Sequence, residues 1–338
     1  MRSWATPYTE DVSRAARLMR RARNEGLRYR SMGSASRAAL RVEWRREAFF
    51  RVAGSFTPTL EAVWPSGRFV VSTTDVDVSR LTFISGPFAL AAAIDTLGFV
   101  RDVLGSDFTL TDGTVLEVGA NIGTGSVVFI TELGASRVRA FEPAPENFRL
   151  LRQTIAANGL ADQITAHQLA LSNECGHVAF ELSPRTWGDH RVRTASPDGS
   201  DEFNESTRNV INVPSASIDS LCRDGTLDPA EIKLVWSDTQ GHEGFLLAGA
   251  RDLLATGVPV VVEFWPYGLC RSGCLEMFVD VAQEHYTHFL NIDDLRYTPV
   301  GDRRPTREHL RPIADLTALE RDYLGKTPAH ADLILFAL

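Results

Sequence analysis

The hydrophobic residues of this chain form two kinds of run, and from residue 112 onward these runs alternate. Short runs rich in β-branched residues predict strands, and longer runs with apolar residues at helical spacing predict helices. The strand-like runs are mostly continuous and apolar, which is typical of parallel strands covered on both faces. They are residues 114–118, 137–141, 164–168, 233–237, 258–264, 288–292 and 332–338. The pattern predicts an α/β fold with a doubly wound, mostly parallel sheet.

Helix signals fill the gaps between these strands. Residues 123–134 and 145–159 follow the first two strands, and the second helix has Phe148, Leu151 and Ile155 on one face. Ligands of such sheets bind beyond the carboxyl ends of the strands. We therefore expect the functional residues in the loops that directly follow each strand.

The N-terminal third has a different pattern. Residues 9–24 predict a helix, and the Ser-, Gly- and Ala-rich stretch 31–39 predicts a linker. Short β-like runs broken by Gly and Pro then predict a small β element ahead of a helix at 89–104. These runs are residues 49–56, 60–64, 67–74 and 81–86. We divide the chain into a basic helical arm with its linker (1–48), a small β-containing element (49–105) and the main domain (106–338).

Charge is unevenly spread along the chain. Residues 1–51 contain thirteen arginines and five acidic residues, a net charge of +8, which leaves −16 for the rest of a chain whose formal charge is −8. A basic arm binds nucleic acid, an anionic membrane surface or an acidic partner, or it packs on its own acidic body. No nucleic-acid motif accompanies the arginines, so we expect a contact within the protein or between subunits of a homo-oligomer.

Compartment and metal content follow from what the sequence lacks. No apolar run reaches the length of a membrane span, and the N-terminus has no apolar core of the secretory kind. The four cysteines are too scattered for a disulfide framework, and no His or Cys completes a zinc spacing around Cys270 and Cys274. We expect a cytoplasmic protein without a metal site.

The loop after the first strand is rich in glycine. Gly119, Gly123 and Gly125 occupy its first, fifth and seventh positions, whereas the dinucleotide fingerprint has glycines at the first, third and sixth. This spacing fits a pyrophosphate cradle poorly and makes an NAD-dependent oxidoreductase the weakest hypothesis. Glycine alone also fits a plain strand-to-helix turn.

An acidic residue follows the second strand. Glu142 lies 23 residues past Gly119, where a carboxylate can accept hydrogen bonds from both ribose hydroxyls of an adenosine. The alternative is a carboxylate that favours the N-terminus of the next helix. The glycine turn and Glu142 together favour the adenosine ligand, with Ala170, Leu171 and Ser172 after the third strand suited to flank its adenine.

The fourth and fifth strands also end in polar and aromatic residues. Ser237 and Asp238 open a dense polar group, although either is also suited to cap the following helix. Glu263 and Trp265 place a carboxylate and an aromatic ring at the same edge. The polar insertion 183–212 contains Trp187, Asp189, His190 and Arg191, which suit a lid over a sugar or an anionic acceptor; an ordinary solvated loop is the alternative.

Several of these segments, taken in order, resemble the FkbM-type methyltransferase family. They are LEVGANIGTGS, AFEPAPENFRLL, ALSNECG, SIDSL, DTQGHEGFLLAGARDLL and PVVVEFWP, and the similarity covers about residues 112–338. The resemblance implies a seven-stranded sheet with a reversed last strand that binds S-adenosylmethionine (SAM), and usually O-methylation of a sugar or natural-product hydroxyl. One stretch departs from the family, which often reads Lys-Ile-Asp-Val-Glu-Gly-Ala-Glu where residues 236–243 read WSDTQGHE. The lost lysine and the gained histidine indicate a distinct acceptor pocket.

We therefore predict a SAM-dependent O-methyltransferase of biosynthesis that acts on a small molecule or glycan. N- or C-methylation, a methyltransferase that binds nucleic acid, and a catalytically silent binding or assembly module are the alternatives. Asp238 is expected to position SAM or the acceptor and His242 to act as the base, with Glu263 in reserve. The predicted cofactor contacts are Glu117, Gly119, Ala120, Asn121, Gly123, Glu142, Pro143, Ala170, Leu171, Ser172 and Asp238. The predicted acceptor contacts are Trp187, Asp189, His190, Arg191, Gln240 and Trp265.

Overall fold

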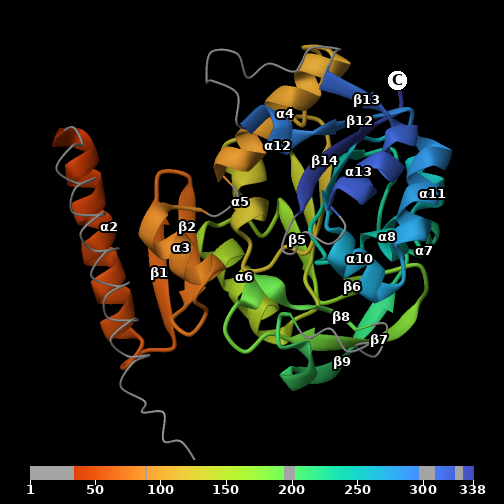
Figure 1. Cartoon of the computed structure of the whole chain (residues 1–338). Helices are drawn as coiled ribbons and strands as arrows, with labels where there is room; N and C mark the ends of the chain where they lie inside the picture. Colours follow the sequence, from red (N-terminus) through yellow and green to blue (C-terminus); the bar gives the residue numbers. More distant parts are fainter. Residues whose placement is uncertain (1–33, 88–89, 194–201, 297–308, 324–329) are drawn as a thin grey trace, which may run out of the picture. The chain divides into compact units, whose positions relative to one another are not determined.

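A computed structural model describes the chain except for residues 1–33, 88–89, 194–201, 297–308 and 324–329 (Figure 1). The chain divides into two compact units, residues 1–51 and 52–338. The β-containing element expected at 49–105 therefore does not form a unit of its own, because nearly all of it belongs to the larger unit.

The N-terminal arm contains helix α2 (Ser34–Ala53). The linker expected at 31–39 is wrong from Ser34 onward, because its alanines are the strongest helix formers. The run 49–56, expected to be β-like, is likewise helical as far as Ala53. The helix predicted at 9–24 lies outside the described residues.

A hairpin opens the larger unit. Strands β1 (Thr59–Trp64) and β2 (Gly67–Ser72) pair antiparallel, as their sequence runs predicted. The run 81–86 is not a strand and lies almost entirely in helix α3 (Val78–Ser85), because Val78 and Thr82, four residues apart, are both buried. Helix α4 (Leu90–Leu104) follows as expected.

The main sheet has eight strands, in the order β13-β12-β14-β11-β10-β3-β4-β5. Their bounds are β3 (Thr114–Val118), β4 (Arg137–Phe141), β5 (Ile164–His167), β10 (Ile232–Ser237), β11 (Val260–Phe264), β12 (His288–Asn291), β13 (Leu310–Pro312) and β14 (Ala331–Phe336). Only β14 and β13 run against the others. The doubly wound sheet with a reversed last strand is confirmed, and the three-residue edge strand β13 was not predicted.

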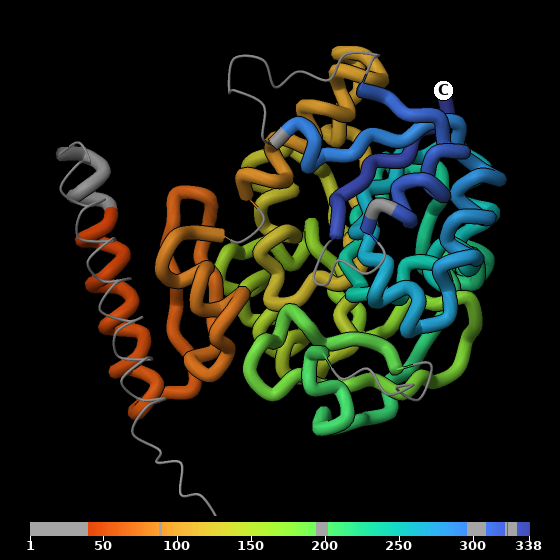
Figure 2. The backbone as a smooth tube through the Cα atoms, viewed as in Figure 1, coloured from red at the N-terminus to blue at the C-terminus, as the bar shows by residue number. Residues whose placement is uncertain are grey.

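Helices connect these strands, and Figure 2 follows the alternation along the chain from β3 to β14. They are α5 (Thr124–Thr131), α6 (Pro145–Ala157), α7 (Ile218–Arg223), α8 (Glu243–Ala248), α9 (Arg251–Leu254), α10 (Pro266–Ser272), α11 (Leu275–His285), α12 (Ile292–Arg296) and α13 (Leu316–Tyr323). One hydrophobic core joins strands β10, β11 and β14 to helices α7–α11 and α13. Helix α6 also anchors the hairpin, since Asn158 and Thr154 accept the backbone N–H groups of Arg68 and Val70 at 2.9 and 3.1 Å.

A second sheet carries the polar insertion. Its order is β6-β9-β7-β8, formed by β6 (Ala170–Leu171), β7 (Gly176–Leu182), β8 (Arg191–Val192) and β9 (Asn209–Ala216). The antiparallel pair β7–β9 flanks the insertion. The insertion itself contains the short helices η1 (Trp187–Asp189) and η2 (Glu205–Thr207).

Within the described ranges no single helix is long and apolar enough to cross a membrane; only α3 and α4 pass together, and they meet at a 91° bend.

Candidate active site

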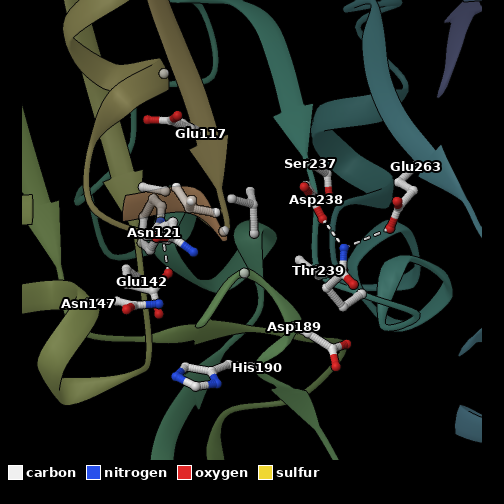
Figure 3. Close-up of a pocket in the computed structure, with 18 of the residues that line it drawn as sticks. Glu117, Asn121, Glu142, Asn147, Asp189, His190, Ser237, Asp238, Thr239 and Glu263 are labelled. Carbon is white, nitrogen blue, oxygen red and sulfur yellow. Dashed lines mark hydrogen bonds between the residues drawn. The ribbon is translucent and has the colours of Figure 1, made fainter. Parts of the chain in front are cut away.

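A cavity of about 660 Å³ lies where strands β3, β4, β10 and β11 end, at the edge that the topology predicted (Figure 3). This volume is in the range of pockets for drug-sized ligands. Its wall includes most of the predicted site residues. Those present are Glu117, Gly119, Ala120, Asn121, Glu142, Pro143, Ala170, Leu171, Trp187, Asp189, His190, Asp238, Gln240, Glu263 and Trp265.

Four predicted residues are not part of this wall: Gly123, Ser172, Arg191 and His242. Gly123 instead supports the turn, since a Cβ there would lie 2.7 Å from Leu151 Cδ1 and its φ is +86°. The other three lie behind the wall in contacts described below.

The glycine turn brings two strand ends together. Gly119 has φ +85°, and a Cβ there would lie 1.9 Å from the backbone oxygen of Asp238. No side chain fits between the loops after β3 and β10, so the turn requires glycine. The loop that carries Asp238 is thereby held against the loop that carries Ala120 and Asn121.

Glu142 ties this turn to the end of β4. Its two carboxylate oxygens accept the backbone N–H groups of Asn121 and Ala144, each at 2.8 Å. Burial raises the pKa of Glu142 to about 7. Each carboxylate oxygen has more than one lone pair, so both retain capacity for a ligand hydroxyl.

Two asparagine side chains beside Glu142 offer further acceptors. Asn121 Nδ2 and Asn147 Nδ2 donate to the carbonyl oxygen of Trp187 at 3.4 and 3.2 Å. Their Oδ1 atoms are buried and have no partner among the described residues, although both residues line the cavity. Buried oxygens without a donor are suited to ligand hydroxyl or amino groups. Sequence reasoning missed Asn147, which lies in the first turn of α6.

Glu117 faces the start of helix α5 rather than open solvent. The Ser126 hydroxyl donates to Glu117 Oε2, and a Cβ on Gly125 would lie 2.1 Å from Oε1. Burial raises the pKa of Glu117 to about 8. The side chain is therefore largely a neutral carboxylic acid at pH 7, which suits a buried support for the turn.

A chain of three side chains forms the opposite wall (Figure 3). Gln240 Nε2 donates to Asp238 Oδ1 at 2.7 Å and to Glu263 Oε2 at 2.9 Å. Asp238 is open to the cavity, yet the surrounding protein desolvates it and raises its pKa to about 6. Desolvation and the charge of Asp238 also raise the pKa of Glu263. Gln240 adopts a φ of +56°, an uncommon conformation that marks this turn as constrained.

His242 does not reach the cavity. It is buried beneath the wall, with Nε2 3.0 Å from Ser172 Oγ and its ring stacked on Phe245 at 4.8 Å. Burial lowers the pKa of His242 to about 3, so the ring stays neutral near pH 7. The assignment of His242 as base has no geometric support here, and Ser172, which contacts His242, does not line the cavity either.

The insertion supplies aromatic and polar groups to the cavity. Trp187, Asp189 and His190 line it, together with Phe203, which the sequence did not single out. Ser183 donates its backbone N–H to His190 Nδ1 at 2.9 Å, and burial lowers the pKa of His190 to about 4. His190 is therefore a neutral ring with one nitrogen already engaged.

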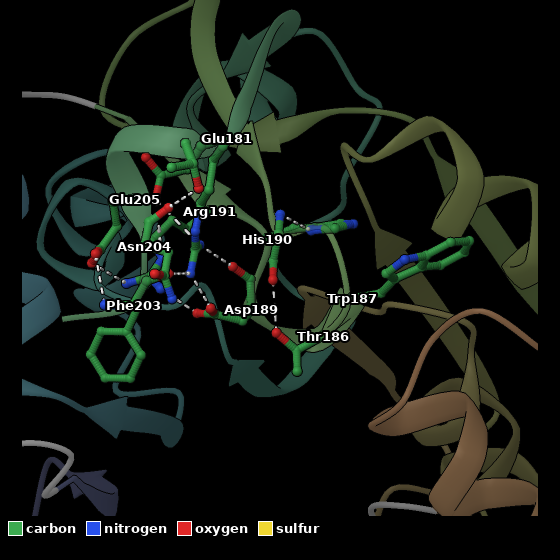
Figure 4. A network of polar contacts seen from close by, with 12 residues as sticks. Glu181, Thr186, Trp187, Asp189, His190, Arg191, Phe203, Asn204 and Glu205 are labelled. Atoms are coloured by element: carbon green, nitrogen blue, oxygen red, sulfur yellow. Dashed lines mark hydrogen bonds and ion pairs between the residues drawn. The ribbon is translucent and has the colours of Figure 1, made fainter. Parts of the chain in front are cut away.

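Arg191 lies behind this wall, in a buried network (Figure 4). Its guanidinium stacks on Trp265 at 4.8 Å and pairs with Asp189 and with Glu181, the latter at 3.4 Å. Arg191 therefore supports the aromatic wall. The expectation that it lines the cavity is wrong. Glu181 also contacts Arg193, Arg208 and Arg271, at 2.7, 3.3 and 3.3 Å.

Residues from outside the predicted motifs complete the cavity. Asp77 and Val78 reach it from the start of α3, and His330 and Asp332 from the start of β14. Asp332 pairs with Glu263 in the strand register, which brings a further carboxylate to this side. Among the described residues, no three His, Cys, Asp or Glu side chains form a group suited to a metal ion.

Comparisons with known proteins agree with this geometry. A family model described as the methyltransferase FkbM domain matches residues 117–295, more than half of the chain. The 2-O-methyltransferase NoeI of Sinorhizobium fredii is 24% identical over 162 residues, covering 45% of this chain and 63% of that protein. The match thus spans less than two thirds of this relative's length.

Similar solved structures include two TYW2 proteins. P. horikoshii TYW2 in complex with MeSAdo is 12% identical with a TM-score of 0.39, covering 83% of this chain and 72% of that one. M. jannaschii TYW2 in complex with AdoMet is 10% identical with a TM-score of 0.38, covering 82% of this chain and 85% of that one.

Proposed function

The chain belongs to the FkbM-domain family of methyltransferases, and we propose that it methylates a hydroxyl oxygen of a sugar or another natural product with SAM as methyl donor. SAM, when bound, supplies a methyl group already activated on a sulfonium sulfur. One observation carries the proposal. The Asp238–Gln240–Glu263 chain and the Gly119 turn face one cavity, so a methyl donor and a proton acceptor fit side by side.

The cofactor side of the cavity fits an adenosine. Glu142 and the free oxygens of Asn121 and Asn147 are hydrogen-bond acceptors for ribose hydroxyls. Ala170 and Leu171 offer an apolar edge for the adenine. The remaining predicted contacts, at the Gly119 turn and Asp238, would then hold the amino-acid end of SAM.

Glu263 is the residue to which we assign the acceptor's proton. An alcohol is a weak nucleophile until a base removes its proton, and a base works best with a pKa near the operating pH. Glu263 lines the cavity, accepts a hydrogen bond from Gln240 and has its pKa raised by burial, whereas His242 lies outside the cavity and His190 has a pKa near 4. Glu263 would accept the hydroxyl proton of the acceptor, and bound SAM would supply the methyl group and leave as S-adenosylhomocysteine.

Gln240 keeps the two carboxylates apart without adding charge. It stands where the family often has glutamate, and its amide donates to Asp238 and to Glu263. A glutamate here would place three carboxylates together and make ionisation of the base costlier. The amide therefore makes ionisation of Glu263 less costly than a third carboxylate would.

The other side of the cavity suits a carbohydrate. Trp187, Phe203 and Trp265 offer aromatic faces, while Asp77 and Asp189 offer acceptors for hydroxyl groups. The 2-O-methyltransferase activity in the name of the relative from Sinorhizobium fredii supports an oxygen acceptor.

The test is methyl transfer from SAM labelled in its methyl group. Neutral glycosides, hydroxylated natural products and amines are offered in parallel to the full-length protein. We expect label on a hydroxyl oxygen, and Glu263→Gln to lower the rate by about 10²- to 10⁴-fold, the usual contribution of a general base. S-adenosylhomocysteine affinity in that variant should stay within about threefold, under 1 kcal/mol.

Asp332→Asn is the matched control, because it removes the neighbouring carboxylate on β14 and leaves Glu263 in place. Label on nitrogen alone would replace the O-methylation proposal with N-methylation. Binding of S-adenosylhomocysteine without transfer to any acceptor class would favour the silent binding module. A normal rate in Glu263→Gln would exclude Glu263 as the base.

A further inference from the structure

The loop Asp75–Val78 precedes the matched family domain, yet it reaches the cavity. We propose that Asp75 is a positioning residue: it fixes the Trp187 peptide at the cofactor side, and this peptide orients Asn121 and Asn147 toward the ligand. The proposal rests on the proposed function, because the ligand at those asparagines is taken to be SAM or its product.

Asp75 is fully buried and joins the two loops directly. Its Oδ1 accepts the backbone N–H of Trp187 at 3.0 Å and that of Asp77 at 3.1 Å. Its Oδ2 accepts the backbone N–H of Ser79 at 2.7 Å. A second bond between the loops runs from the Val76 N–H to the Arg185 carbonyl at 3.0 Å. The insertion is therefore tied to a segment more than a hundred residues earlier.

The far side of the same peptide meets the cofactor side of the cavity. The Trp187 carbonyl oxygen accepts hydrogen bonds from Asn121 Nδ2 and Asn147 Nδ2, at 3.4 and 3.2 Å. An amide whose nitrogen is engaged presents its oxygen elsewhere, and here both Oδ1 atoms are buried without a partner among the described residues. Fixing the Trp187 peptide therefore fixes two acceptors for the ligand.

Packing reinforces the hydrogen bonds. A Cβ on Gly188 would lie 2.9 Å from Val78 Cγ2, closer than side chains normally approach. Gly188 and Val78 both line the cavity, so the contact between the loops is part of the cavity wall. Loss of this contact or of Asp75 would let the Trp187 peptide move and release both asparagine amides.

The first test measures S-adenosylhomocysteine binding to the full-length chain by titration calorimetry, with thermal unfolding as a check of folding. Asp75→Ala should weaken binding by about tenfold, the scale of one lost buried hydrogen bond. Asp75→Asn keeps one oxygen for the Trp187 N–H and should bind within about threefold of the wild type.

Ser79→Ala is the matched control. It removes the hydroxyl of α3 that accepts the N–H of Ser72 in β2 at 3.1 Å, while the backbone bond from Ser79 to Asp75 remains. We expect lower thermal stability but unchanged affinity. Equal affinity in Asp75→Ala and the wild type would overturn the proposal, as would a loss in Ser79→Ala as large as in Asp75→Ala.

A second pair of variants decides the question if Asp75→Ala does not fold. Gly188→Ala should weaken S-adenosylhomocysteine binding, because the new Cβ pushes the turn off Val78. Adding Val78→Ala makes room for that Cβ and should restore the affinity. Failure of this rescue would overturn the coupling between the loops. A wild type that does not bind S-adenosylhomocysteine would instead overturn the proposed function.

Discussion

The two sides of the cavity are built in different ways. The cofactor side consists of loops that directly follow neighbouring strands, and Gly119, Asn121 and Glu142 come from two short stretches of sequence. The acceptor side gathers residues from the insertion, from the loop before α3 and from the start of β14. The strand ends and the insertion are identified in the sequence, whereas the contributions of Asp77, His330 and Asp332 emerge only from the packing of distant segments.

The two sides also differ in what holds their charges. Glu142 on the cofactor side is held by the backbone N–H groups of Asn121, in the loop after β3, and of Ala144, in its own loop. The acceptor side rests on a buried network in which arginines outnumber carboxylates. Its members are Glu181, Asp189, Glu205, Arg191, Arg193, Arg208 and Arg271 (Figure 4). Hydrogen bonds from backbone N–H groups thus hold the carboxylate of the cofactor side, and buried ion pairs hold the acceptor side.

Breaking the ion pairs should have the largest effect on stability. Glu181→Leu leaves four arginines without their shared carboxylate, and an uncompensated buried charge typically costs about 3–5 kcal/mol. Chemical denaturation should show a loss of this size in the free energy of unfolding. The acceptor-dependent rate should fall further than the affinity for S-adenosylhomocysteine.

An exposed ion pair provides the control. Glu146→Gln removes the partner of Arg149 on the surface of α6, and such pairs contribute little. If Glu181→Leu were no more destabilising than this control, the ion-pair network would not be what stabilises the acceptor side.

Three of the predicted residues that line the cavity have one feature in common. Gly119, Glu142 and Asp238 each follow a strand end by no more than one residue, so the strand fixes where they lie. His242 is five residues past β10, at the start of a helix, and turns inward to Ser172. Spacing along the chain does not determine the direction in which the His242 side chain points.

The errors in the fold have a similar origin. The run 81–86 is apolar and β-branched, but burial at helical spacing makes it part of α3. Short apolar runs fit either element until their packing partner is known. The contribution of Asp77 to the cavity depends on that same helix and on its contact with the insertion, so no local pattern could have indicated it.

The cofactor side should respond most to the loss of Glu142. Glu142→Ala removes the acceptor of two backbone N–H groups and of the ribose, and we expect S-adenosylhomocysteine affinity to fall by about 1–3 kcal/mol. Calorimetry at constant pH measures this change. Glu146→Ala, on the exposed face of α6, should bind normally. Unchanged affinity in Glu142→Ala would contradict the proposal that Glu142 binds the ribose hydroxyls.

The smallest expected effect concerns Glu117, and it shows whether this residue supports the turn or contacts the ligand. Burial raises the pKa of Glu117 to about 8, from an ordinary value of 4.5. The folded state therefore holds a proton that the unfolded state releases, and the stability from this group is lost as pH rises toward 8. One such group lowers the free energy of unfolding by up to about 1.4 kcal/mol per pH unit.

Glu117→Gln cannot titrate, so its free energy of unfolding should depend less steeply on pH between 4.5 and about 8. A residual slope should persist, because Glu142 and Glu243 also have pKa values raised to about 7. S-adenosylhomocysteine affinity at pH 6 should be nearly unchanged, since the neutral amide replaces a neutral acid. Equal slopes with a large loss of affinity would instead identify Glu117 as an ionised ligand contact.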